Sequence, residues 1–229
     1  SLSILPNRLL NKDFEINLLS IINQSIKPIK IIINYCSKYK RNFKYNVSKF
    51  NEKIEYLKKK YPILLFNCVK DYGPATKVLG LINFKNIINS DDIVIIVDDD
   101  FSYNKNLIYY YNLCYQLYNC DCISIDEKKI ISWKTQPKNI NKDNIFYDNY
   151  QGFTYGWLSF SFKYRIINDL LIFYEELLLI DKNTWNHDDL LLTLYFKKYK
   201  YYHCGINLFL TIFGDRKMEL IDGLRIENN

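Results

Sequence analysis

Long hydrophobic runs are missing from this sequence of 229 residues. No segment reaches the roughly 18 continuous apolar residues that a membrane-spanning helix needs. The first residues also lack the basic start and apolar stretch of a secretory signal peptide. The sequence therefore predicts a cytoplasmic protein with no membrane span in this chain.

Glycine, proline and patterned cysteine are also scarce. The chain has 7 Gly and 5 Pro, with 48% hydrophobic and 24% charged residues, which is the balance of a soluble globular protein and excludes a fibrous or disordered one. No CxxC pair occurs among the cysteines, so neither a zinc site nor a disulfide framework is predicted, and we expect reduced thiols in the core. The six cysteines are Cys36, Cys68, Cys114, Cys120, Cys122 and Cys204.

The charge is moderately positive, with 31 Lys and Arg against 25 Asp and Glu, a formal net charge of +6. A basic stripe with interleaved aromatic residues would indicate nucleic-acid binding, but the basic residues here are scattered. We therefore expect no nucleic-acid partner, and an anionic small substrate fits the charge. The oligomeric state stays open at this stage.

The first hundred residues alternate short apolar runs with helical patterns. Strands are predicted at residues 2–5, 29–33, 61–66 and 93–97, and helices at 13–24, 51–60 and 74–82. Strands that are apolar on both faces are typical of a parallel sheet covered by helices. An α/β, doubly wound arrangement is therefore predicted for the N-terminal part.

The pattern changes after residue 100. Helices are predicted at 106–117, 164–179 and 187–199, strands at 121–125, 130–133, 201–204 and 208–213, and a polar loop at 134–149. The length suits one large core. We therefore predict a single α/β domain over 1–229, with a mostly parallel central sheet flanked by helices and a smaller mixed or antiparallel C-terminal part.

Three consecutive carboxylates, Asp98, Asp99 and Asp100, directly follow the apolar run at 93–97. Ligands of open α/β sheets bind at the carboxyl ends of the strands, which is where this triplet is expected. Three adjacent carboxylates repel one another unless a cation offsets them, and carboxylate oxygens suit Mg²⁺ or Mn²⁺. The alternative is an acidic turn that caps the next helix.

This strand and triplet, IVIIVDDD at 93–100, follow the segment DYGPATK at 71–77 by some twenty residues. Together they resemble the GT-A glycosyltransferases, particularly the family-2-like enzymes with an Asp-x-Asp motif. The resemblance covers most of the chain, since the start of the sequence matches the opening βαβ unit of the family. It implies that residues 1–100 bind a nucleotide sugar and that residues 101–229 bind the acceptor and carry catalysis.

The resemblance implies an enzyme that moves a sugar from a nucleoside diphosphate sugar to a hydroxyl group of a glycan, a protein or a small molecule. Uridine diphosphate is the favoured donor nucleotide on family grounds. Asp98 and Asp100 would hold Mn²⁺ or Mg²⁺, and Asp98 and Asp99 would contact the donor. The metal would act as a Lewis acid on the phosphate oxygens of the leaving group.

Three further residues of the N-terminal part are candidates for donor binding. Gly73 permits a tight turn and Pro74 suits the first position of a helix, so Lys77 is expected near a helix N-terminus, where anions bind. The alternative for Lys77 is a solvated surface lysine. For Asp71 we expect either a contact with the base or ribose of the donor or a plain N-cap role. For Arg8 we expect a contact with the diphosphate or base of the donor, and the alternative is an exposed surface arginine.

A second acidic pair, Asp188 and Asp189, begins the last predicted helix. Acidic residues in a first turn stabilise the helix dipole, so a structural role is one interpretation. In the family, a paired acidic motif late in the domain supplies the general base, and the resemblance implies that one of the two carboxylates removes the acceptor proton. Displacement would then be direct and the anomeric configuration would invert.

Gly152 and Gly156 lie among aromatic residues in the stretch 151–157. Glycine permits close backbone approach and aromatic faces suit a sugar ring, and in the family a glycine-containing segment lines the donor-sugar pocket. An aromatic-rich strand with glycine bulges is the alternative.

Other protein classes share parts of this pattern. A phosphotransferase of the haloacid dehalogenase kind needs its aspartates near the chain start, and a nucleotidyltransferase usually has a glycine-rich loop with Arg and Lys after the first strand; neither feature is present. A non-catalytic nucleotide-sugar-binding or scaffold module would keep the same fold and residues.

Overall fold

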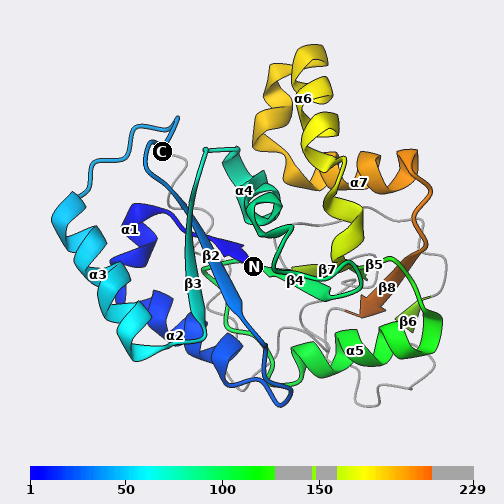
Figure 1. Cartoon of the computed structure of the whole chain (residues 1–229), viewed down its shortest axis with the longest axis horizontal. Helices are drawn as coiled ribbons and strands as arrows, with labels where there is room; N and C mark the ends of the chain where they lie inside the picture. Colours follow the sequence, from blue (N-terminus) through cyan, green and yellow to red (C-terminus); the bar gives the residue numbers. More distant parts are fainter. Residues whose placement is uncertain (127–145, 148–158, 208–229) are drawn as a thin grey trace, which may run out of the picture.

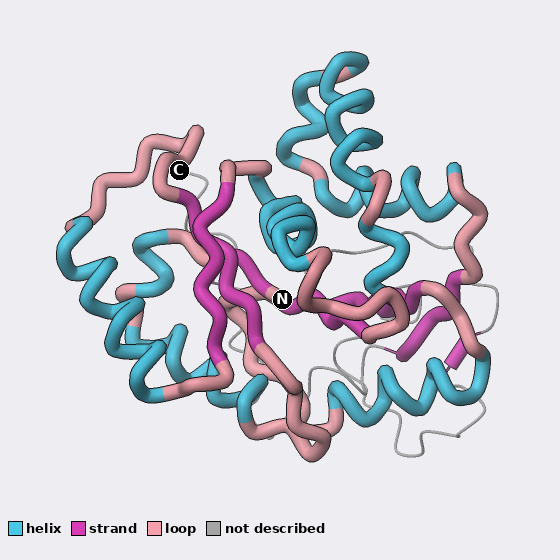
Figure 2. The backbone as a smooth tube through the Cα atoms, in the orientation of Figure 1, coloured by secondary structure: helices cyan, strands magenta, loops and turns pink. Residues whose placement is uncertain are grey.

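The computed structural model describes residues 1–126, 146–147 and 159–207. These residues form two sheets that helices cover (Figures 1 and 2). The parallel sheet contains β1 (Leu2–Ser3), β2 (Ile31–Cys36) and β3 (Leu64–Val69). The mixed sheet, in spatial order, contains β4 (Ile93–Val97), β7 (Ser159–Lys163), β5 (Cys122–Asp126), β8 (His203–Asn207) and β6 (Phe146–Tyr147).

The two sheets meet where the chain begins. The Ser1 amino group donates to the Ile95 carbonyl at 2.6 Å, and the Val97 N–H donates to the Ser1 carbonyl at 3.0 Å. The strands therefore run β3, β2, β1, β4, β7, β5, β8, β6 across the molecule. This arrangement confirms the predicted α/β fold, with parallel strands in the N-terminal part and mixed pairing in the C-terminal part.

Helices lie on both faces of the sheets (Figure 1). One face is covered by α1 (Pro6–Leu9), α2 (Lys12–Ile22), α3 (Val47–Lys60) and α5 (Leu107–Tyr118), the other by α4 (Thr76–Leu79), α6 (Leu170–Ile180) and α7 (Asp188–Lys198). Successive residues of a strand point to opposite faces. Ile31 and Ile33 accordingly pack with the first group of helices and Ile32 with the second.

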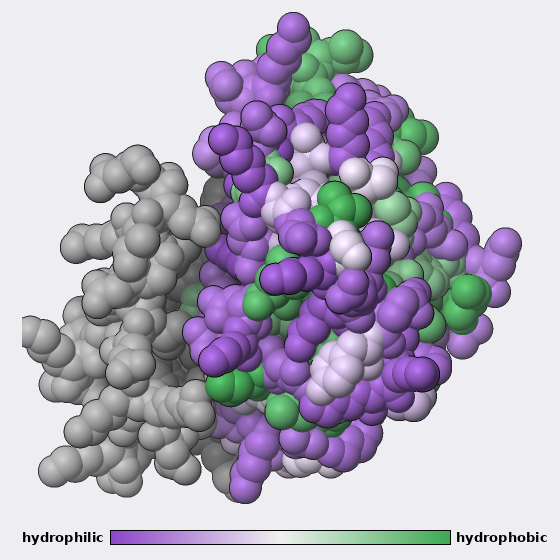
Figure 3. Space-filling view, turned by 90° about the vertical axis from the view of Figure 1, so that its left-hand side faces the viewer, coloured by the Kyte–Doolittle hydropathy of each residue, from purple (hydrophilic) through white to green (hydrophobic). Residues whose placement is uncertain are grey.

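Side-chain caps explain where the N-terminal helices begin. The Asn11 side chain accepts from the Asp13 N–H at the start of α2, and the Asn46 side chain accepts from the Lys49 N–H at the start of α3. The latter helix thus starts at Val47, four residues before the predicted 51–60. Three lysines in its last turn favour the helix dipole. The side of the molecule on which α3 lies has a largely hydrophilic surface (Figure 3).

The C-terminal part departs from the prediction at β7. The helix predicted at 164–179 is preceded by an unpredicted strand, and 164–167 form a short 3₁₀ turn, η4 (Tyr164–Ile167), before α6 begins at Leu170. Alternation explains the strand, since Phe160 and Phe162 enter the core on one face while the intervening serines lie on the other. β6 lies within the predicted loop at 134–149. The strands predicted at 130–133 and 208–213 fall outside the described residues.

Three further short 3₁₀ segments complete the described structure: η1 (Gly73–Ala75), η2 (Gly80–Phe84) and η5 (Lys182–Asn186). η1, α4 and η2 together make up the helix predicted at 74–82. No helix in the described part of the chain is long and apolar enough to cross a bilayer.

Candidate active site

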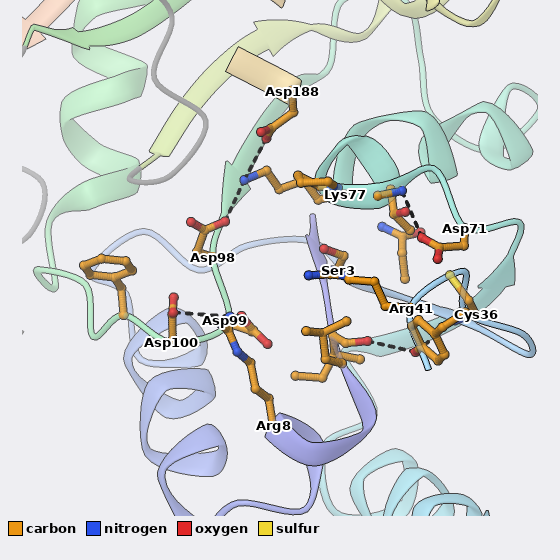
Figure 4. Close-up of a pocket in the computed structure, with 18 of the residues that line it drawn as sticks. Ser3, Arg8, Cys36, Arg41, Asp71, Lys77, Asp98, Asp99, Asp100 and Asp188 are labelled. Atoms are coloured by element: carbon orange, nitrogen blue, oxygen red, sulfur yellow. Dashed lines mark hydrogen bonds and ion pairs between the residues drawn. The ribbon is translucent and has the colours of Figure 1, made fainter. Parts of the chain in front are cut away.

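A pocket opens at the carboxyl ends of the parallel strands β1, β2, β3 and β4 (Figure 4). The loop after β1, the end of β2, the turn after β3 and the triplet after β4 all line it, and the start of α7 closes one side. Because these strands run parallel, their ends meet at one edge of the sheet, where ligands of open α/β folds bind.

The lining is rich in charge and dominated by carboxylates. The acidic residues are Asp71, Asp98, Asp99, Asp100, Asp188 and Asp189, and the basic residues are Arg8, Arg41 and Lys77. Six carboxylates against three cations leave a formal charge of −3 on the pocket. A diphosphate would be repelled by this excess unless a cation accompanied it.

Lys77 lies at the centre of the inner part of the pocket. Its Nζ is 2.7 Å from Asp98 Oδ1 and 3.1 Å from Asp188 Oδ2, and the residue is only 5% exposed (Figure 4). Burial by itself lowers the pKa of Lys77, but the two carboxylates outweigh burial and hold that pKa above its usual value. Lys77 is therefore a buried cation between the residue after β4 and the start of α7. The alternative of a solvated surface lysine is wrong.

Buried amides position the helix that carries Lys77. The Asn67 side-chain amide donates to Asn34 Oδ1 and to the Gly80 carbonyl, both at 2.8 Å, and so ties β2, β3 and the end of α4 together. A Cβ on Gly80 would lie 2.3 Å from Asn34 Oδ1, so only glycine permits this close approach. Sequence reasoning missed these asparagines, although a polar residue directly after Ile31–Ile33 in an otherwise apolar strand was a signal.

Asp98 directly follows β4, and both its backbone and its side chain are hydrogen-bonded. Its N–H donates to the hydroxyl of buried Tyr103 at 2.7 Å, and its Oδ1 accepts from Lys77. Burial raises the pKa of Asp98 to about 7, against the opposing effect of Lys77.

Arg8 forms the outer group with the other two triplet members. Its Nη1 lies 2.5 Å from Asp99 Oδ1 and 3.2 Å from Asp100 Oδ2. Burial raises the pKa of Asp99 to about 6, although Arg8 acts in the opposite direction. Among the described residues, Asp99 Oδ2 is buried and has no hydrogen-bond partner.

The donor set of the triplet fits a hard divalent cation. Lys77 contacts Asp98 Oδ1 and Arg8 contacts Asp100 Oδ2, while in the described part of the chain the buried Asp99 Oδ2 has no hydrogen-bond partner. Carboxylate oxygens are the ligands that Mg²⁺ and Mn²⁺ prefer. The charge of −3 on the pocket favours the same kind of ion.

Asp188 and Asp189 both line the pocket from the first turn of α7. Asp188 is 8% exposed and paired with Lys77, whereas Asp189 is more accessible. Asp188 is linked through Lys77 to Asp98, and both acidic motifs of the sequence line the same pocket.

Asp71 is already engaged by the backbone. Its Oδ2 accepts from the Lys40 N–H at 2.7 Å and its Oδ1 from the Gly73 N–H at 2.9 Å. Gly73 has φ +65°, and a Cβ there would lie 2.4 Å from the Trp185 carbonyl oxygen. Lys40 and Arg41 lie over the Trp185 ring, at 4.8 Å and 5.9 Å from its centroid. This cluster joins the loop after β2 to the segment just before Asp188.

Arg41 is a pocket residue that sequence reasoning missed, because nothing in its polar surroundings marks it. Gly152 and Gly156, predicted to line the donor-sugar pocket, lie outside the described residues.

Comparison with known proteins supports the fold. No family model and no curated protein matches the sequence. The structure is similar to S. aureus TarS 1–349 with TM-score 0.54 and 13% identity over 90% of this chain and 56% of that chain. TarS 1–349 in complex with UDP-GlcNAc gives TM-score 0.54 and 12% identity over 95% and 58%.

Francisella tularensis 2-C-methyl-D-erythritol 4-phosphate cytidylyltransferase gives TM-score 0.51 and 12% identity over 90% of this chain and 88% of that one. The chain thus spans little more than half the length of the TarS chains that it resembles. These likenesses, at 12–13% identity, establish a GT-A-type α/β fold.

Proposed function

We propose that the protein is a metal-dependent, family-2-like glycosyltransferase that moves a sugar from a nucleoside diphosphate sugar to a hydroxyl acceptor. The observation that carries the proposal is the position of Lys77, whose buried ammonium joins Asp98 at the end of β4 to Asp188 at the start of α7. Lys77, the proposed contact of the departing diphosphate, is thereby next to Asp188, a carboxylate that can take a proton. A similar fold binds UDP-GlcNAc in TarS, which favours a UDP-sugar as donor.

Asp98 and Asp100, the Asp-x-Asp pair, would hold Mn²⁺ or Mg²⁺. When bound, such an ion supplies a Lewis acid for the oxygens of the diphosphate. Arg8 and Lys77 add fixed positive charge on either side of the triplet, and Asp99 keeps Arg8 in place. Asp71 shapes the nucleotide end of the pocket through its two backbone hydrogen bonds.

Asp188 is the proposed general base. Its carboxylate would accept the proton of the acceptor hydroxyl as the hydroxyl oxygen forms its bond to the anomeric carbon of the sugar. The bond from that carbon to the diphosphate oxygen breaks in the same displacement, so the configuration inverts. Lys77, whose Nζ lies 3.1 Å from Asp188 Oδ2, holds this carboxylate in position for that step. Asp189 is the alternative base, and Gly152 and Gly156 remain predicted donor-sugar contacts.

The first test measures thermal stability with UDP-, GDP- and CDP-sugars, with and without Mn²⁺. A ligand that binds only the folded state raises the melting temperature as its concentration exceeds the dissociation constant. We expect a shift for one nucleotide sugar that requires the metal and disappears in Asp98→Asn and Asp100→Asn. Slow release of free sugar without acceptor would then indicate a transferase, whereas binding without any turnover would favour the non-catalytic module. No shift with any nucleotide would contradict the donor site.

A nucleotidyltransferase is the second candidate, because the cytidylyltransferase fold is matched over most of its length. Such an enzyme releases pyrophosphate from a nucleoside triphosphate. Pyrophosphate release from CTP or UTP with a sugar phosphate, in the absence of sugar transfer from nucleotide sugars, would favour it over the glycosyltransferase.

A further inference from the structure

Three cysteines gather in the core away from the pocket. Cys114 lies on α5, Cys120 follows that helix, and Cys204 lies on β8, which is next to α5 (Figure 1). Their sulfur atoms all lie within 4.8 Å of one another, and each residue is 0% exposed. None of the three forms a disulfide in the described structure.

The connection after α5 creates this cluster. Asn119 ends the helix in the left-handed conformation, with φ 46°, and its N–H donates to the Tyr115 carbonyl. The chain thus turns sharply and brings Cys120 back toward Cys114, one and a half helical turns earlier in the sequence. Cys204 completes the group because alternate residues of β8, Cys204 and Ile206, face the same core cluster.

The spacing is close to that of a three-sulfur ion site. Sulfurs bonded to one ion at about 2.3 Å lie roughly 4 Å from one another, so a small contraction of the cluster would suffice. The ligand group that the described residues form there consists of three sulfur atoms. His203 precedes Cys204 in β8 but faces the other side, where its Nε2 lies 2.8 Å from Ser124 Oγ. A purely sulfur donor set selects soft ions.

The charge of a soft ion decides how well it fits three buried thiolates. The three sulfur atoms are buried within a hydrophobic core cluster. Three buried thiolates need three positive charges to be neutral, and an uncompensated charge in the core is costly. A trivalent ion with three thiolates is neutral, while a divalent ion leaves one negative charge and a monovalent ion two.

We propose that Cys114, Cys120 and Cys204 form a trithiol site for a soft trivalent ion, with arsenic(III) as the matching chemistry. Arsenious acid, As(OH)₃, would react with three thiols so that three S–H and three As–O bonds break, and three As–S bonds and three molecules of water form. No oxidant or reductant is needed. The site is independent of the proposed glycosyl transfer, because it lies on the opposite face of the sheet from α4 and α7.

The test uses arsenite with the whole chain, both folded and refolded from urea, because the cluster is closed to solvent. We expect one arsenic per chain after desalting, with three sulfur neighbours by X-ray absorption spectroscopy. The wild-type measurement requires no substitution, so it stands even where a variant fails to fold. Two sulfur neighbours and an oxygen, or no retained arsenic, would overturn the proposal.

Matched variants locate the ion. Cys120→Ala and Cys204→Ala should each weaken arsenite binding at least tenfold, and Cys122→Ala should leave it unchanged. Cys122 is an apt control because it is also 0% exposed and only two residues from Cys120, yet it belongs to the core cluster on the other face of the sheet. Equal loss in Cys122→Ala, or full binding in Cys204→Ala, would contradict the assignment.

Discussion

The pocket contains two ion clusters that differ in depth. The inner cluster is Lys77 with Asp98 and Asp188, whose side chains are 6%, 19% and 10% exposed. The outer cluster is Arg8 with Asp99 and Asp100, in which Arg8 and Asp100 are 33% and 35% exposed. A buried ion depends on its partners, while water screens an accessible one. The inner cluster should therefore control folding and chemistry together, and the outer cluster mainly ligand affinity.

The origin of the residues differs as well. The inner cluster joins α4, the end of β4 and the start of α7, so it connects the N-terminal and C-terminal parts of the chain. The ion pairs of the outer cluster join α1 to the residues after β4, all within the first hundred residues. Breaking the inner cluster thus removes a contact between distant segments.

Lys77→Met should have the largest effect. It leaves Asp98 and Asp188 buried without their cation, and removal of one partner from a buried ion pair costs about 3–5 kcal/mol. We expect a loss of about 3 kcal/mol in the free energy of unfolding, measured with urea, and no detectable sugar transfer. Lys85→Met, at an exposed lysine just after η2, is the control and should unfold like wild type. Wild-type stability in Lys77→Met would show that the inner cluster is not a structural unit.

Asp188→Asn separates the chemical role of the inner cluster from its structural one. The amide is of the same size and Lys77 keeps Asp98 as a partner, so the fold should persist. Loss of a general base should lower kcat by about 10²–10⁴ with little change in donor affinity. Asp189→Asn should lower kcat less than about tenfold. The opposite ranking of the two variants would move the base to Asp189.

His203 on β8 is a half-buried ionisable group of a different kind, because burial is the main influence on its pKa. Burial lowers the pKa of His203 to about 4, with a further contribution from Lys197. The ring packs against Phe196, and its Nε2 lies 2.8 Å from Ser124 Oγ. The unfolded chain, with the usual value of 6.5, binds the proton first as the pH falls. The stability is thus fully present above about pH 6.5 and is lost as the pH falls toward 4.

The expected loss is about 3 kcal/mol in the free energy of unfolding between pH 7 and pH 4. His203→Gln should remove this part of the pH dependence, since glutamine does not titrate in the range. Urea unfolding at several pH values measures the difference. Parallel pH profiles for wild type and variant would show that His203 binds its proton equally well in the folded and the unfolded protein.

Sequence patterns were most informative where local chemistry decides the structure. The run Ile93–Val97 is a strand with the predicted bounds, and the position of Asp98 in the pocket follows from the rule for strand ends. The contact of Lys77 with Asp188 was not predicted, because it depends on how α7 crosses the sheet. β7 was missed because its serines look solvent-facing, whereas Ser159 and Ser161 pair with the hydroxyls of buried tyrosines on α5.

Arg8→Gln should have the smallest effect of this series on stability. Arg8 is accessible enough for water and salt to screen it, so we expect a change below about 1 kcal/mol in the free energy of unfolding. Affinity for the nucleotide sugar should fall roughly tenfold, by calorimetry, because Asp99 and Asp100 lose the cation beside the metal ligands.

Arg165 provides the matched control, since this arginine also pairs with two aspartates, Asp91 and Asp121, but outside the pocket. Arg165→Gln should therefore resemble Arg8→Gln in stability and wild type in nucleotide affinity. If Arg8→Gln instead destabilises the protein as much as Lys77→Met, the outer cluster is a structural partner of the inner one. The difference in depth would then not separate folding from ligand binding. Removal of either cation would destabilise the fold, because both cations pair with the same triplet, Asp98, Asp99 and Asp100.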